Sequence, residues 1–295
     1  MDFLVLHGGP GLNSYPEHAI LGPHFEAAGH RAHFWNEPSR LRPNGDPFHR
    51  EGAFENWIAS AERLLVARAG PEPVALIAHS VATVAAIELA RRHPLRLSSL
   101  VLVSPCTCVL TSLRNILVLA HQCAADEGSA VASRLAECVG QSRAILDDAM
   151  RQAFDLILEN PRLLVQMFSR YWVDQGRFRT ALAAQACTEA QFDPESFFSV
   201  LEDLRDRGSS VTSQAPVKTP TLALFAEDDP VCKAADQVRT VQSEAPNNRI
   251  ENVKRCGHFL HLEQPAAFVQ RALDWALSAA ARPPCNPPGP GTTKA

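Results

Sequence analysis

Residues 73–92 read PVALIAHSVATVAAIELARR, in which a short apolar run leads directly into a serine and then into small residues. The run Pro73 to Ala78 predicts a buried strand, and Val81 to Arg92 predicts a helix. Ser80 then lies at a sharp strand-to-helix turn, a position that exposes a nucleophilic hydroxyl. Such turns usually have glycine two residues before and after the serine, but this chain has alanine at both places. Alanine predicts a slightly wider or more strained turn, and the motif alone also fits a structural serine at a helix start.

Apolar runs alternate with helical patterns along the chain, which predicts an α/β fold whose mostly parallel, doubly wound sheet has helices on both faces. Residues 107–213 break this alternation and predict several helices in succession, beginning at Asn160-Pro161 and Asp193-Pro194. We predict a core over residues 1–106 and 214–281, an inserted helical cap over 107–213, and a Pro- and Gly-rich disordered tail over 282–295. The other predicted strands are Phe3–Leu6, Arg31–Trp35, Leu97–Val103, Pro220–Phe225 and Asn248–Val253, and the other predicted helices span about residues 54–65 and 265–277.

The composition of the 295-residue chain excludes several kinds of partner. A net charge of −4 does not suit a nucleic-acid binder. No apolar run reaches the roughly 20 residues that a membrane span needs, and no signal peptide is visible. The eight cysteines are scattered, and the spacing of Cys106 and Cys108 is not that of a zinc knuckle. We therefore expect reduced thiols, a cytoplasmic location and no metal site.

A base and an acid that could activate the serine follow later strands. Gly257-His258-Phe259 comes after the strand ending at Val253, which places His258 at the same sheet edge as Ser80. His261, one helical turn later, is the nearest rival, but it is expected to cap or pack. The strand 222–225 is followed by Ala226-Glu227-Asp228-Asp229-Pro230, which offers three acids. Asp229 is the preferred partner of His258, with Asp228 and then Glu227 as alternatives.

The first predicted strand ends in His7-Gly8-Gly9-Pro10-Gly11, a glycine turn that could also stabilise an oxyanion. Pro10 has no N–H, so Gly9 is the better donor, and Val81 is expected to supply the second. A tight turn alone remains the alternative for the glycines. Oxyanion loop, serine, acid and histidine follow one another in chain order, each at a strand end, and this order favours a catalytic site.

On these residues the chain resembles the α/β-hydrolase superfamily from Phe3 to about Ala280. The loop at residues 7–11 is similar to that of proline iminopeptidases, and residues 257–265, GHFLHLEQP, are similar to many esterases and carbon–carbon bond hydrolases. The resemblance implies an eight-stranded, mostly parallel sheet, a helical cap, a small-molecule substrate and no cofactor. The elbow lacks the tryptophan that peptidase relatives have after the serine, which disfavours aminopeptidase activity. Relatives also have two antiparallel strands before the oxyanion loop; without them an exposed sheet edge could favour a homodimer.

The leading hypothesis is a serine hydrolase that cleaves an ester, thioester or related acyl bond, or a carbon–carbon bond, through an acyl-enzyme. The alternatives are a non-hydrolytic enzyme on the same fold, such as a lyase, acyltransferase, cyclase or cofactor-free oxygenase, and a non-catalytic binding protein. Aromatic residues of the predicted cap suggest an apolar or aromatic acyl group, although ordinary packing explains their spacing equally well. The expected substrate-binding residues are Gly8, His79, Tyr171 and Trp172, and the other cap aromatics are Phe168, Phe178, Phe192, Phe197 and Phe198.

Overall fold

A computed structural model describes residues 1–42, 45–68, 72–185, 191–207 and 215–281. The six strands found there form one parallel sheet in the order β2-β1-β3-β4-β5-β6, which confirms the predicted fold class. Their bounds are β1 Asp2–Leu6, β2 Arg31–Trp35, β3 Val74–His79, β4 Leu97–Val103, β5 Thr221–Ala226 and β6 Asn248–Val253.

The expectation of eight strands is wrong for the part of the chain that the structure describes. The first strand already begins at Asp2, and the two antiparallel strands that relatives have before the oxyanion loop are not among the described residues. The central strands β1, β3 and β5 are buried almost along their whole length, because helices cover both faces of the sheet. The sheet's two edges are β2 and β6, in which only the last residues, Trp35 and Val253, are buried.

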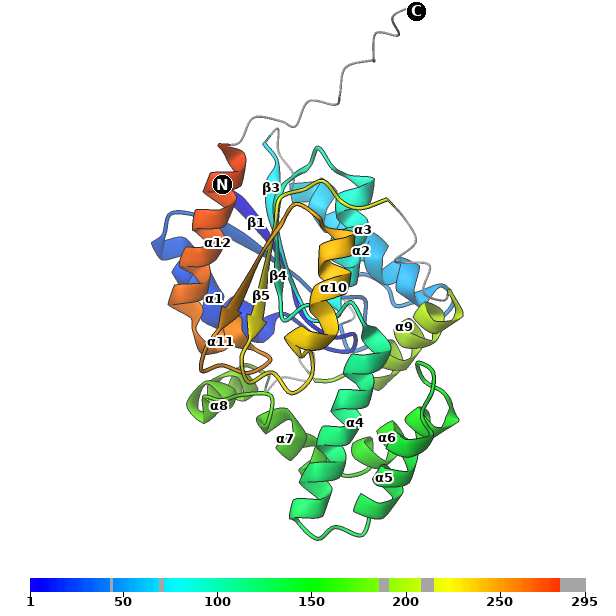
Figure 1. Cartoon of the computed structure of the whole chain (residues 1–295). Coiled ribbons are helices and arrows are strands. Elements are labelled where there is room, and N and C mark those ends of the chain that lie inside the picture. The colour runs from blue at the N-terminus through cyan, green and yellow to red at the C-terminus, as the bar shows by residue number, and fades with distance from the viewer. Residues whose placement is uncertain (43–44, 69–71, 186–190, 208–214, 282–295) are drawn as a thin grey trace, which may run out of the picture.

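Helices cover both faces of the sheet (Figure 1). The helices α1 (Tyr15–Ala27) and α12 (Pro265–Ala280) pack against each other on one face. The other face is covered by α2 (Ala53–Arg68), α3 (Ala82–Arg92) and α10 (Ala234–Glu244). The sequence patterns predicted α2, α3 and α12 but neither α1 nor α10. In α1 the apolar residues form no regular stripe, since buried Glu17 takes a place on its inner face.

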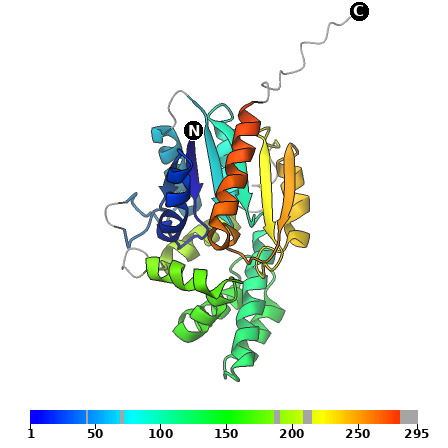
Figure 2. The same cartoon turned by 90° about the vertical axis from the view of Figure 1, so that its left-hand side faces the viewer.

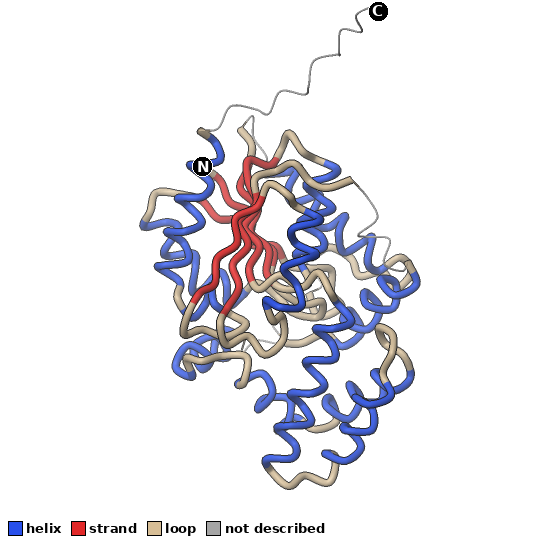
Figure 3. Tube along the Cα trace, viewed as in Figure 1, coloured by secondary structure: helices blue, strands red, loops and turns tan. Residues whose placement is uncertain are grey.

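A second group of helices lies beyond the edge of the sheet where the strands end (Figures 2 and 3). Helices do begin at Pro161 and Pro194, and the Asp193 carboxylate caps the second of them by accepting hydrogen bonds from the N–H groups of Glu195 and Ser196. These helices fall within the segment that we predicted as a cap. They are α4 (Val109–Asp126), α5 (Ala132–Gln141), α6 (Asp148–Leu158), α7 (Pro161–Ser169), α8 (Gln175–Ala184) and α9 (Pro194–Asp206); the short α11 (Leu260–Glu263) precedes α12.

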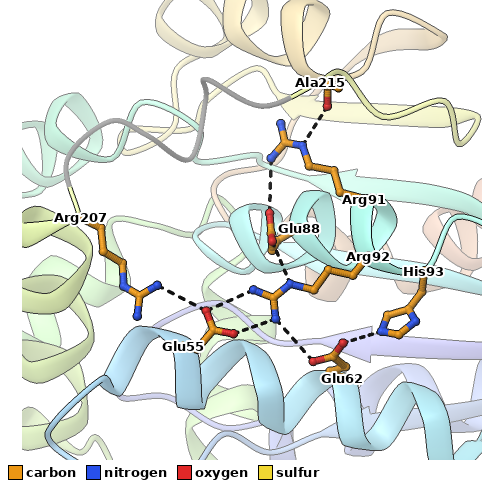
Figure 4. A network of polar contacts seen from close by, with 8 residues as sticks. All are labelled: Glu55, Glu62, Glu88, Arg91, Arg92, His93, Arg207 and Ala215. Carbon is orange, nitrogen blue, oxygen red and sulfur yellow. Dashed lines mark hydrogen bonds and ion pairs between the residues drawn. The ribbon is translucent and has the colours of Figure 1, made fainter.

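A network of charged side chains joins α9 to the helices beside the sheet (Figure 4). Arg92 on α3 pairs with Glu55 and Glu62 on α2, and Arg207 at the end of α9 also pairs with Glu55. The shared Glu55 carboxylate connects α2, α3 and α9, and the Arg92 guanidinium holds the pKa of that carboxyl below its usual range. Asp193, just before α9, donates its N–H to the carbonyl of Gly11 in the loop that follows β1, so the network helps to position a helix that is tied to this loop.

Within the described residues, no helix is long and apolar enough to cross a membrane. Six cysteines, at 106, 108, 123, 138, 232 and 256, have free thiols there. Cys187, Cys285 and the predicted tail lie outside the described residues.

Candidate active site

Ser80 lies at the turn between β3 and α3 with φ of 53°, in the left-handed region that non-glycine residues rarely adopt. Its N–H donates to the carbonyl of Val103 on β4 (2.9 Å), and its carbonyl accepts from the N–H of Cys106 (3.2 Å). Ala78 and Ala82 on either side are fully buried. These backbone hydrogen bonds therefore hold Ser80 in a strained conformation without the two glycines that are usual at such a turn.

Three side chains from three strand ends meet in one hydrogen-bonded line. Ser80 Oγ lies 3.0 Å from His258 Nε2, and His258 Nδ1 lies 2.9 Å from Asp229 Oδ2. Asp229 accepts the Nδ1 proton, so Nε2 carries the lone pair that can take the serine proton. Among the acids after β5, Glu227 and Asp228 are exposed, whereas Asp229 is buried beside the histidine.

The loop after β5 keeps Asp229 ionised. Its Oδ1 accepts hydrogen bonds from the N–H groups of Val231 (2.8 Å) and Cys232 (2.9 Å). Burial opposes the charge, but His258 and these N–H donors more than offset it and hold the pKa of Asp229 below its ordinary value. An ionised, fixed carboxylate can orient the imidazole and stabilise it when it becomes protonated.

The predicted oxyanion donors lie on the same cavity as Ser80. Gly9 has φ of 130°, and both Gly9 and Val81 line the cavity at the serine. In the described part of the chain no group accepts a hydrogen bond from either N–H. Two free backbone donors beside Ser80 could stabilise the negative oxygen of a tetrahedral intermediate.

Glu37, which the sequence patterns did not single out, holds the oxyanion loop from beneath. Its buried carboxylate accepts hydrogen bonds from Gly11 N–H (2.7 Å), Ser196 Oγ (2.8 Å) and Trp57 Nε1 (2.7 Å). Gly11 also accepts a 2.8 Å bond from the N–H of Asp193. Burial raises the pKa of Glu37 to about 7 although its donors favour the charged form. The residue connects β2, α2 and α9 to the loop that carries Gly9.

Glu263 fixes the loop that carries His258, between β6 and α11, by accepting backbone hydrogen bonds. One carboxylate oxygen accepts a bond from Gly257 N–H (2.7 Å), and the other accepts bonds from the N–H groups of Val173 (2.8 Å) and Asp174 (2.6 Å). The N–H of His258 itself donates to the carbonyl of Tyr171 (2.7 Å). A Cβ on Gly257 would lie 2.1 Å from that carbonyl oxygen, so only glycine permits this approach.

Two adjoining cavities meet at Gly8. A cavity of about 90 Å³ is lined by Ser80, His258 and predicted substrate-binding residues Gly8, His79 and Tyr171. A second, of about 180 Å³, is lined by Gly8 and Trp172. Five residues line both cavities: Gly8, Leu12, Phe168, Phe192 and Phe259. Phe197 lines the first and Phe178 the second, whereas Phe198 lines neither and packs on Phe154.

His79 directly precedes Ser80 and is buried. Burial, together with the neighbouring imidazoles of His261 and His258, lowers its pKa well below the usual value, so it is neutral. Its Nε2 donates to the carbonyl of His258 (3.0 Å), which ties the serine turn to the histidine loop. The rival histidine His261 is buried 4.5 Å from His79, measured between ring centroids, and does not contact Ser80 by any hydrogen bond.

Solved structures share this fold at low sequence identity. A proline iminopeptidase-related protein from Thermus thermophilus is 21% identical, with a TM-score of 0.61 over 95% of this chain and 89% of that one. An esterase from Thermogutta terrifontis is 15% identical, with a TM-score of 0.57 over 95% of this chain and 90% of that one. A putative non-heme bromoperoxidase from Mycobacterium tuberculosis is 18% identical, with a TM-score of 0.60 over 95% of this chain and 93% of that one. No curated protein matches the sequence. The model of the alpha/beta hydrolase family matches residues 3–271, and with this match the chain belongs to that family, as its resemblance implied.

Proposed function

We propose that this protein is a serine hydrolase that cleaves a small ester, thioester or related acyl compound through an acyl-enzyme. The observation that carries the proposal is the line from Ser80 Oγ through His258 to Asp229, with bonds of 3.0 and 2.9 Å. Neighbours of this fold include proteins named as an esterase, an epoxide hydrolase and bromoperoxidases, so the fold by itself does not select a reaction.

In the proposed first step Ser80 Oγ attacks the acyl carbonyl while its proton passes to His258 Nε2. Asp229 stabilises the resulting imidazolium, and the N–H groups of Gly9 and Val81 stabilise the oxyanion. When the tetrahedral intermediate collapses, His258 gives the proton to the leaving alcohol, thiol or other group. Water then attacks the acyl-enzyme, losing a proton to His258, and the acid leaves as Ser80 regains its hydrogen.

The two adjoining cavities support a small, largely apolar substrate. Their volumes are about 90 Å³ and about 180 Å³, and aromatic rings form much of their walls. Among the residues lining the second cavity, the polar side chains are Asn13, Glu17 and Gln185, and none is basic. A short or aromatic acyl group suits such walls better than one that carries a carboxylate or phosphate.

The test is labelling with a fluorophosphonate, followed by peptide mapping and a panel of acyl esters and thioesters. Wild type should be labelled on Ser80, and Ser80→Ala should lose both labelling and turnover. Ser104→Ala is the matched control, since Ser104 directly follows the neighbouring strand β4 with φ of 42° and has no histidine partner among the described residues. Full activity of Ser80→Ala on the preferred substrate would contradict the proposal.

Product analysis in ¹⁸O-labelled water separates hydrolysis from the non-hydrolytic alternative. Hydrolysis places one solvent oxygen in the acid product. A lyase, acyl-transfer or cyclisation reaction on the same three residues would form product without that oxygen.

A further inference from the structure

Three buried side chains that the proposed reaction does not use meet behind the nucleophile. They are Glu17 on α1, His79 at the end of β3, and His261 on α11, all exposed by 3% or less. Each offers a ligand atom for a metal ion, and these atoms lie within 4.8 Å of one another. Two imidazoles and a carboxylate are a donor set that binds divalent transition metals. We call these residues the Glu17–His79–His261 cluster.

The cluster does not satisfy its own hydrogen-bonding groups. Glu17 Oε2, His79 Nδ1 and His261 Nδ1 are buried and have no partner among the described residues. Buried polar atoms in proteins are nearly always hydrogen-bonded, so Glu17 Oε2 and His79 Nδ1 point to a group that they hold, while His261 faces Glu17 with its other nitrogen, Nε2.

The hydrogen bonds of His79 decide which of its nitrogens is free. Nε2 donates its proton to the carbonyl of His258, so Nδ1 carries a lone pair. A second ring nitrogen that donates to a backbone carbonyl is the usual support of a metal-bound histidine. A Cβ at Gly8 would lie 2.6 Å from His79 Nδ1, so a larger residue at position 8 would crowd this nitrogen.

The separation of the other two residues also suits a metal. Glu17 Oε1 and His261 Nε2 are 3.5 Å apart, which is long for a hydrogen bond. Two ligand atoms at about 2.0–2.1 Å from a tetrahedral zinc ion are about 3.4 Å apart. Glu17 and Gly8 both line the 180 Å³ cavity, which gives an ion and a water ligand access to the cluster.

We propose that the Glu17–His79–His261 cluster binds one divalent transition-metal ion of the zinc class. The ion joins α1, the serine turn and α11, and through His79 it steadies the carbonyl of His258. Hard ions such as Mg²⁺ and Ca²⁺ are excluded as the preferred occupants, because they favour all-oxygen ligands. The site does not depend on the identity of the substrate or on the reaction at Ser80.

The test is a titration of chelator-treated full-length protein with Co²⁺, followed by visible absorption, and with Zn²⁺, followed by thermal unfolding. His258→Gln is the background, because Asp229, Cys232 and His258 form a second set of ligand atoms within 4.8 Å. We expect one equivalent of Co²⁺ to bind in that background without a thiolate charge-transfer band, and Zn²⁺ to raise the Tm.

Adding Glu17→Gln to that background should weaken Co²⁺ binding by at least about 100-fold and remove the Zn²⁺-dependent rise in Tm. Glu26→Gln, an exposed carboxylate on the same helix, is the matched control and should leave both unchanged. His261→Gln provides an independent test should Glu17→Gln not fold. Binding that disappears in His258→Gln alone, binding that survives both cluster variants, or no binding at all would overturn the proposal and leave a trapped water as the occupant.

Discussion

Replacing Glu37 by glutamine removes a titratable group from beneath the oxyanion loop, and the effect on stability should depend strongly on pH. Burial raises the pKa of Glu37 in the folded protein to about 7 from an ordinary value of 4.5. Between these values the folded state binds more protons than the unfolded state. The contribution of Glu37 to stability is therefore greatest at low pH and is lost as pH rises through this window.

The size of the effect follows from the two pKa values. The full shift is worth about 3.5 kcal/mol, at about 1.4 kcal/mol for each pKa unit. The unfolded carboxyl has already begun to ionise at about pH 5.5. Between about pH 5.5 and about pH 8.5 we therefore expect wild type to lose about 2 kcal/mol of unfolding free energy relative to Glu37→Gln. The variant also carries a penalty that does not depend on pH. One amide cannot accept hydrogen bonds from Gly11, Ser196 and Trp57 together, which lowers the unfolding free energy of Glu37→Gln by about 1–3 kcal/mol at every pH.

The assay is urea unfolding of both proteins at several pH values, with the difference in free energy plotted against pH. Glu26→Gln is the control, because an exposed carboxyl should give a flat difference from wild type. A difference in unfolding free energy between wild type and Glu37→Gln that stays constant across this pH range would show that the donors around Glu37 keep its carboxyl ionised throughout. That result would contradict the raised pKa.

Four other outcomes can be checked. Asp229→Asn should fold normally yet lower kcat by about 10⁴-fold, since His258 would lose the acceptor that selects its tautomer; a loss below about tenfold in steady-state kinetics would refute that role. Gly257→Ala should lower the Tm and kcat together, because its Cβ would lie 2.1 Å from the Tyr171 carbonyl oxygen, and an unchanged Tm would contradict this contact. Arg92→Met should cost only about 1 kcal/mol in urea unfolding at low salt and less at high salt, because its partners are partly exposed. Pairing through the exposed edge strand β2 or β6 predicts a homodimer by light scattering, and a monomeric mass at all concentrations would exclude it.

The alternation of strands and helices could be inferred from sequence because it depends on short-range periodicity. β1, β3, β4 and β5 lie where apolar runs predicted them, and the helices after Asn160 and Asp193 begin at the following proline. The helix α1 was missed, since its sequence has no apolar stripe: buried Glu17 occupies a place where a stripe would have a hydrophobic residue. The number of strands was overestimated, because it came from the resemblance and not from this chain's residues.

Residue order along the chain was enough to predict that Ser80, Asp229 and His258 lie close together, because parallel strands all end at one edge of the sheet. The residues that support them could not be found this way. Glu37 reaches Gly11 across 26 positions and Ser196 across 159, and these contacts exist only once β2 and α9 have packed beside the oxyanion loop. The meeting of Glu17, His79 and His261 likewise arises from packing, since no local pattern records which distant side chains share a buried space.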